Sequence, residues 1–215
     1  MTTYAIRRLS RTSVVCGIAI LLTVGCNRKA DNSLNFTNAL NTYYSAHPAC
    51  LWSDPIKFPV QADTSDSSKT SGYDALVDQG LLVRTTAEKK KFIIASKQVN
   101  NYDLSDKGRS AWTADVNQPG FGNFCYGHRK ISGIDSSTPT SSAVGATTQV
   151  TYHSSMADAP AWASAPETQN AYPQLRADLA GSKPGQATLT NTSNGWQVSS
   201  VKLARTSSAD GQIVE

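Results

Sequence analysis

The spacing of apolar residues predicts an early helix followed by a mixture of short strands and helices. Residues 34–47 carry apolar side chains mostly three to four positions apart, which is typical of a helix with one buried face, and Pro48 ends the pattern. A second helix is predicted over residues 73–79, with Gly80 as its C-cap. The elements expected next are strands from Leu81, at residues 92–94 and at residues 102–104, and then a short helix capped by Ser105 that runs through Trp112.

The second half of the chain has the pattern of an antiparallel sheet. Residues 124–134 and 147–154 are predicted to pair as a hairpin with a long polar loop. The Asn194-Gly195 turn between Leu189 and Val198 predicts a second, tighter hairpin. A helix over residues 166–179, divided or kinked at Pro173, is expected between the two hairpins. The predicted fold class is therefore α+β, with about four antiparallel strands and one inserted helix after a helical N-terminal lobe.

Two segments of that N-terminal lobe resemble the closing helix and wing of a winged helix-turn-helix. They are ALVDQGLLVR (residues 75–84) and YDLSDKGRSAW (residues 102–112), and the resemblance covers roughly residues 70–112. Function does not follow from that shape, since one fold serves many activities. The basic run Lys89-Lys90-Lys91 fits either a wing tip that contacts phosphate or a solvated hairpin turn, and we interpret it as the solvated turn.

Residues 1–25 have the pattern of an export signal. Arg7, Arg8 and Arg11 form a basic segment, and residues 14–24 form an apolar run of eleven residues. A helix that crosses a bilayer needs roughly 20 residues, so this run suits a cleaved signal better than a membrane span.

The sequence Leu22-Thr23-Val24-Gly25-Cys26 resembles the bacterial lipobox, with Thr23 in a position where Leu is usual. The resemblance implies cleavage before Cys26 and acyl chains on that residue, which would hold the protein on a membrane because two or more chains bind firmly. The alternative is an ordinary cleaved signal with Cys26 as a structural thiol. Asn27, rather than Asp, favours the outer membrane over the inner one.

Charge and composition narrow the classes of partner. The chain has 215 residues, with 20 Lys and Arg against 16 Asp and Glu. Without the three signal arginines, 17 basic residues face 16 acidic ones, a formal charge of +1. Such a domain has no general electrostatic attraction for nucleic acid, and we expect none to bind.

The cysteine count predicts one disulfide. Of the four cysteines, Cys16 would leave with the signal and Cys26 would be acylated, which leaves Cys50 and Cys125. An oxidising compartment favours a bond between them, and no CxxC or His spacing supports the alternative of a metal pair or a reactive thiol.

No motif for catalysis, a metal or a cofactor is present. His128 and His153 lie on strands that we pair and are interpreted as ordinary strand histidines. The four tryptophans fit either a ligand groove or core anchors, and we favour the core: Trp52, Trp112, Trp162 and Trp196. A hydrolase would need a cleft that joins an acid such as Asp103 or Asp135 to a histidine.

The predicted organisation has five parts: a signal peptide at 1–25, a lipidated tether at 26–33, a winged-helix-like lobe at 34–115, an antiparallel lobe at 116–203 and a loose tail at 204–215. The segments APAWA (159–163) and NGWQV (194–198) are similar to uncharacterised proteobacterial envelope lipoproteins. The favoured function is a non-enzymatic binding or assembly module that faces the periplasm, bound to the membrane through Cys26 and in contact with an envelope protein. The alternatives are a hydrolase of envelope polymers and a tethered inhibitor of an extracytoplasmic enzyme.

Overall fold

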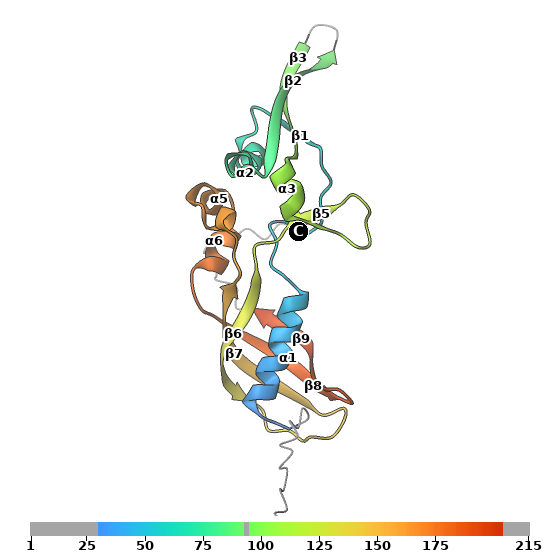
Figure 1. Cartoon of the computed structure of the whole chain (residues 1–215), viewed down its shortest axis with the longest axis vertical. Coiled ribbons are helices and arrows are strands. Elements are labelled where there is room, and N and C mark those ends of the chain that lie inside the picture. The colour runs from blue at the N-terminus through green and yellow to red at the C-terminus, as the bar shows by residue number, and fades with distance from the viewer. Residues whose placement is uncertain (1–29, 93–94, 204–215) are drawn as a thin grey trace, which may run out of the picture.

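The computed structural model describes residues 30–92 and 95–203 of an elongated α+β chain (Figure 1). The predicted signal peptide, Cys26 and the tail at 204–215 therefore lie outside the described residues. A hairpin of β2 (Leu82–Phe92) and β3 (Ala95–Leu104) projects at one end of the molecule. A four-stranded sheet with a helix across it forms the other end (Figure 1).

The four-stranded antiparallel sheet is confirmed, with strand order β6-β7-β8-β9. Its strands are β6 (His128–Ser137), β7 (Thr147–Ala157), β8 (Lys183–Thr192) and β9 (Gly195–Leu203). The predicted hairpin of β8 and β9 is confirmed, with its turn at Ser193-Asn194, one residue earlier than expected. Gly195 pairs with Thr192 and has a φ of 106°, which favours glycine. The predicted strand at 124–134 is instead broken by Gly127, because its φ of 124° interrupts extended backbone before β6.

One face of this sheet is covered by α1 (Ser33–Ala46), which the spacing of apolar residues predicted. Asn32 caps the helix by accepting a hydrogen bond from the Asn35 amide. Burial along β7 alternates, so one face of the sheet packs on the helix and the other faces solvent. The buried core between helix and sheet contains these side chains: Phe36, Leu40, Tyr44, Ile131, Val150, Tyr152, Ala187, Leu189 and Trp196.

The elements β1 (Val60–Asp63) and α2 (Ser67–Asp78) lie between the projecting hairpin and that sheet. The helix α2 begins six residues earlier than predicted, because Asp66 caps it. Gly80 follows α2 in the left-handed conformation, as expected of a C-cap. The three-stranded sheet has the order β1-β3-β2. The winged-helix resemblance is not confirmed: a single helix, α2, stands between β1 and β2, where a helix-turn-helix needs two.

The remaining elements are short. Ser105 caps α3 (Asp106–Ala111) as predicted, and β4 (Trp112–Ala114) pairs with β5 (Gly122–Phe124). The predicted inserted helix forms as α4 (Ala161–Ser164), α5 (Pro166–Ala171) and α6 (Pro173–Leu179), divided at Pro173 as expected. Beside α2, these helices help to form a second core: Ala62, Leu76, Leu81, Leu82, Tyr102, Phe124, Tyr126, Trp162, Ala163 and Leu175.

The two cores do not follow the order of the chain. The helix α1 packs on the C-terminal sheet, whereas α4 to α6 pack with the N-terminal elements. The chain therefore crosses between the cores repeatedly: after α1, before β6, after β7 and before β8. The predicted disulfide between Cys50 and Cys125 is confirmed, and it joins the first two of these crossings.

Removing this disulfide should destabilise the whole chain. In the chain-entropy model, a bridge over 75 residues stabilises the folded state by about 4 kcal/mol. We therefore expect the Cys50→Ser/Cys125→Ser variant to lose about that much free energy of unfolding, measured by urea denaturation without reductant. As a control, alkylation of the unfolded, unreduced protein should label neither thiol, and labelling of both would contradict the bond.

Candidate functional site

The backbone around the disulfide is a short antiparallel bridge between two connecting segments. Cys50 and Cys125 lie opposite each other in that bridge. On either side of the pair, the Leu51 amide donates to Phe124 O at 3.0 Å and the Ala49 amide donates to Gly127 O at 2.8 Å. The disulfide therefore fixes a backbone pairing that neither segment forms within a larger sheet.

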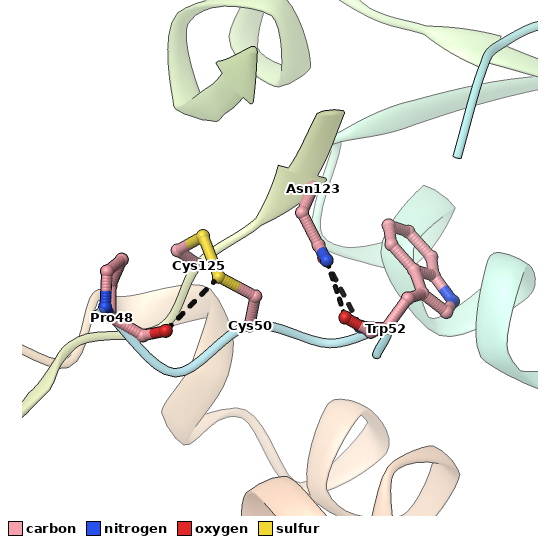
Figure 2. The surroundings of a disulfide bond; sticks show 5 residues. All are labelled: Pro48, Cys50, Trp52, Asn123 and Cys125. Carbon is pink, nitrogen blue, oxygen red and sulfur yellow. Dashed lines mark hydrogen bonds between the residues drawn. A yellow bond between two sulfur atoms is a disulfide. The ribbon is translucent and has the colours of Figure 1, made fainter. Parts of the chain in front are cut away.

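Two residues beyond Cys50, the backbone of Trp52 is clamped by a side-chain amide. Asn123 Nδ2 donates to Trp52 O at 2.6 Å, and the Trp52 amide donates to Asn123 Oδ1 at 3.2 Å, as Figure 2 shows. The backbone N–H and the backbone carbonyl of Trp52 are thus both hydrogen-bonded to one residue of β5. The disulfide and Asn123 together set the position from which the indole ring extends.

The indole of Trp52 lies among aromatic rings from distant parts of the sequence. Its centroid is 6.3 Å from that of Tyr73 on α2 and 6.4 Å from that of Tyr172 between α5 and α6. It also packs near Phe58, Trp112 and Phe124. Such edge and tilted arrangements stabilise aromatic clusters beyond the area they bury.

A cavity of about 240 Å³ opens between these rings, which we call the aromatic pocket. Its walls are the rings of Trp52, Tyr73 and Tyr172, and its polar lining comes from Gln61, Ser68 and Lys69. Gly72 also lines it, and a Cβ at that position would lie 2.9 Å from the Tyr172 hydroxyl oxygen. The absence of a side chain at residue 72 therefore lets Tyr172 approach α2.

The charges around the aromatic pocket are largely neutralised. Burial raises the pKa of both Tyr73 and Tyr172, so both phenols stay protonated at neutral pH. Lys69 Nζ lies 3.2 Å from Asp66 Oδ2. Hydrogen bonds from the Ser68 hydroxyl and the Lys69 side chain lower the pKa of Asp66, which keeps that partner ionised. The pocket thus combines three rings with neutral hydroxyls and one cation that already has a counter-charge.

Two further hollows have a different lining. A groove of about 490 Å³ runs between α1 and β9 and includes Tyr43 and Trp196. A hollow of about 420 Å³ lies beside the disulfide, where Trp52, Asp115 and Asn123 line it. None of these three cavities is lined by an acid together with a histidine.

A buried ion pair lies at the boundary between the two cores. Arg129 on β6 and Asp178 on α6 are each 7% exposed, and Arg129 Nη2 donates to Asp178 Oδ1 at 2.6 Å. Tyr126 and Gln174 also donate to the Asp178 carboxylate, at 2.8 and 3.1 Å. Burial and the bond to Asp178 raise the pKa of Tyr126. Because burying a charge requires a partner, this network ties α6 to the sheet.

The histidines are separated rather than gathered. His128 is paired in register with Ala157 and His153 with Gly133, so the two imidazoles do not face each other across β6 and β7. His153 Nδ1 lies 2.8 Å from Asp135 Oδ2 on the solvent-facing side of the sheet. The third, His47, stacks on Tyr43. Asp103 accepts a hydrogen bond from the Leu104 amide. The Asp135–His153 pair is the acid and histidine combination considered from sequence, but it lines none of the three cavities.

The tryptophans divide between the two cores. Trp162 and Trp196 are each 6% exposed, as expected of core anchors. Trp112 packs against Phe124 at the edge of one core. Trp52 is only partly buried and lines two of the cavities, so it also serves as a wall of the candidate site. Sequence reasoning did not find Tyr73, Tyr172 or Asn123, because nothing local marks residues that meet only in the fold.

Comparisons with known proteins add no family to this description. Searches of protein-family models, curated proteins and solved structures found no match to the chain. Over residues 30–92 and 95–203, no helix is both long and apolar enough to cross a membrane. Within the same ranges, no three His, Cys, Asp or Glu side chains form a group that could hold a metal ion.

The buried ion pair should be far more important for stability than an exposed one. Asp178→Asn leaves Arg129 buried without a counter-charge, which we expect to cost about 3–5 kcal/mol of unfolding free energy in urea denaturation. The matched control is Asp106→Asn, which removes a pair with Arg109 whose side chains are 59% and 99% exposed. That change should cost at most about 1 kcal/mol. Equal losses in the two variants would show that the buried Arg129–Asp178 pair contributes no more to stability than an exposed pair.

Proposed function

We propose that this chain is a bacterial envelope lipoprotein, anchored through acyl chains on Cys26, whose folded part acts as a non-enzymatic binding or assembly module facing the periplasm. The observation that carries the proposal is the lipobox-like sequence Leu22-Thr23-Val24-Gly25-Cys26, after a basic and apolar N-terminal segment. The Cys50–Cys125 disulfide supports it, because such bonds persist in oxidising compartments such as the periplasm. Asn27 supports an outer-membrane destination.

The start of the described chain supports a short tether. Ala30 O accepts hydrogen bonds from Trp196 Nε1 at 3.1 Å and from Asn35 Nδ2 at 2.9 Å, so this carbonyl is held against β9 and α1. Four residue steps separate it from Cys26, a reach of about 14 Å when fully extended. An anchor at Cys26 would thus hold the sheet end close to the membrane and direct the β2–β3 hairpin away from it (Figure 1).

A binding role is favoured over catalysis by the lining of the cavities. The aromatic pocket offers rings and neutral hydroxyls, which suit recognition, whereas hydrolysis of a polymer would need an acid and a base around a reacting bond. The β2–β3 hairpin, with Lys89 to Lys91 in its strand β2, then serves as a protein-contact element for an envelope partner rather than as a DNA-binding wing.

The anchor is tested by replacing the acylated residue. Cells that express the full-length chain with Cys26→Ala should incorporate no labelled palmitate into the protein, because the thiol that accepts the lipid is gone. The protein should also leave the membrane fraction. Cys16→Ala, which changes a second cysteine of the N-terminal segment, is the matched control and should leave labelling intact. Labelling that survives Cys26→Ala would contradict the anchor.

A further inference from the structure

The aromatic pocket combines features that point to a small, ring-shaped and polar ligand. Three aromatic residues line it: Trp52, Tyr73 on α2 and Tyr172 between α5 and α6. Its volume of about 240 Å³ lies below the range of about 300–1,000 Å³ that is usual for drug-sized ligands. The size therefore suits one six-membered ring with its substituents rather than a peptide or a nucleotide.

The hydroxyl groups of Tyr73 and Tyr172 are available to such a ligand. Neither hydroxyl has a hydrogen-bond partner in the part of the chain that the structure describes. A polar group in a partly buried site normally finds a partner, and one that lacks it gains when a ligand supplies the missing bond. A purely apolar ligand would leave both phenols unpaired, which argues against a lipid chain or an aromatic side chain.

The charge of the pocket argues against an anion. Its cation, Lys69, already lies 3.2 Å from the carboxylate of Asp66, and no acidic side chain lines the cavity. A phosphate or carboxylate would have to compete with Asp66 for the ammonium group. An uncharged ligand avoids that competition and still contacts the two phenol hydroxyls and the aromatic residues.

We propose that the aromatic pocket binds one uncharged pyranose ring of a glycan, with its C–H faces against Trp52, Tyr73 and Tyr172 and its hydroxyls on the two phenols. A sugar ring alone among common ligands presents apolar C–H faces and a rim of neutral hydroxyls, which matches this lining. The pocket lies beside α2 and α5, away from the N-terminus of α1, so a glycan beyond the membrane surface reaches it more readily than a lipid headgroup (Figure 1).

The inference rests on the proposed function only for the source of the glycan, since the pocket chemistry holds wherever the protein resides. The test uses the full-length chain, purified in detergent from whole-cell extract, and isothermal titration calorimetry. The probes are tri-N-acetylchitotriose and maltotriose, which are uncharged, and trigalacturonate, which is anionic. At least one neutral probe should bind at least tenfold tighter than trigalacturonate. Tighter binding of tri-N-acetylchitotriose would indicate an N-acetylated glycan, and tighter binding of maltotriose a glucan.

Conservative variants place the binding in the pocket. Tyr172→Phe keeps the ring and removes one unpartnered hydroxyl, so we expect the affinity for the neutral probe to fall about three- to tenfold. Tyr43→Phe is the matched control, because Tyr43 lines the separate groove between α1 and β9, and it should leave the affinity unchanged. Lys69→Gln should likewise change the affinity for the neutral probe less than twofold.

Three results would overturn the inference: no binding of either neutral probe to folded protein, equal losses in Tyr172→Phe and Tyr43→Phe, or tighter binding of trigalacturonate that depends on Lys69. Palmitate labelling of the same preparation reports on the anchor separately. A labelled protein that binds no sugar would refute the glycan site and leave the proposed lipoprotein function standing.

Discussion

The Cys50–Cys125 disulfide holds together two segments that each carry the chain from one core to the other. Because α1 belongs to the sheet at one end and β1 to the helices in the middle, residues 47–59 must cross between them. Residues 125–127 return from β5 to β6 beside that crossing. Joining the two crossings makes the second core depend on the first, and it fixes the backbone from which Trp52 reaches its aromatic neighbours (Figure 2).

The buried network at Asp178 links the crossing before β8 to the crossing before β6. It connects α6, which leads into β8, to Tyr126 and Arg129 at the beginning of β6. A second buried polar contact lies between α1 and the sheet, where the Tyr44 and Tyr152 hydroxyls form a hydrogen bond. Burial raises the pKa of both tyrosines. A buried polar layer needs definite partners, whereas apolar side chains tolerate sliding. It therefore specifies how the helices sit on the sheet.

Features that depend on neighbouring residues were predictable from sequence. The tight hairpin of β8 and β9 at Gly195, the cap at Ser105 and the division at Pro173 each follow from the conformations their own residues prefer. The disulfide followed from the cysteine count. The break before β6 was missed because residues 124–134 were interpreted as one strand, although Gly127 is a residue type that readily adopts a positive φ.

Features that depend on the assembled fold were not predictable. Nothing in residues 34–47 indicates that their apolar face packs on a sheet that begins at residue 128. Trp52, Tyr73 and Tyr172 meet only because three separate segments converge, so the aromatic pocket has no sequence signature. Asp178 offered one usable signal: it lies three residues after Leu175, on the same face of a predicted helix, where a charge needs a buried partner.

The central claim is that the disulfide positions Trp52 through the backbone pairing around it. Hydrogen exchange measured residue by residue in native protein and in Cys50→Ser/Cys125→Ser tests this most directly. The amides of Leu51 and Ile56, which donate to Phe124 O and Gly122 O, should lose protection in the variant together with that of Trp52. Amides at the centre of β7 and β8 should lose only the protection that the fall in global unfolding free energy explains, because they exchange through unfolding of the whole chain. Unchanged protection at residues 51–56 in the variant would contradict the claim.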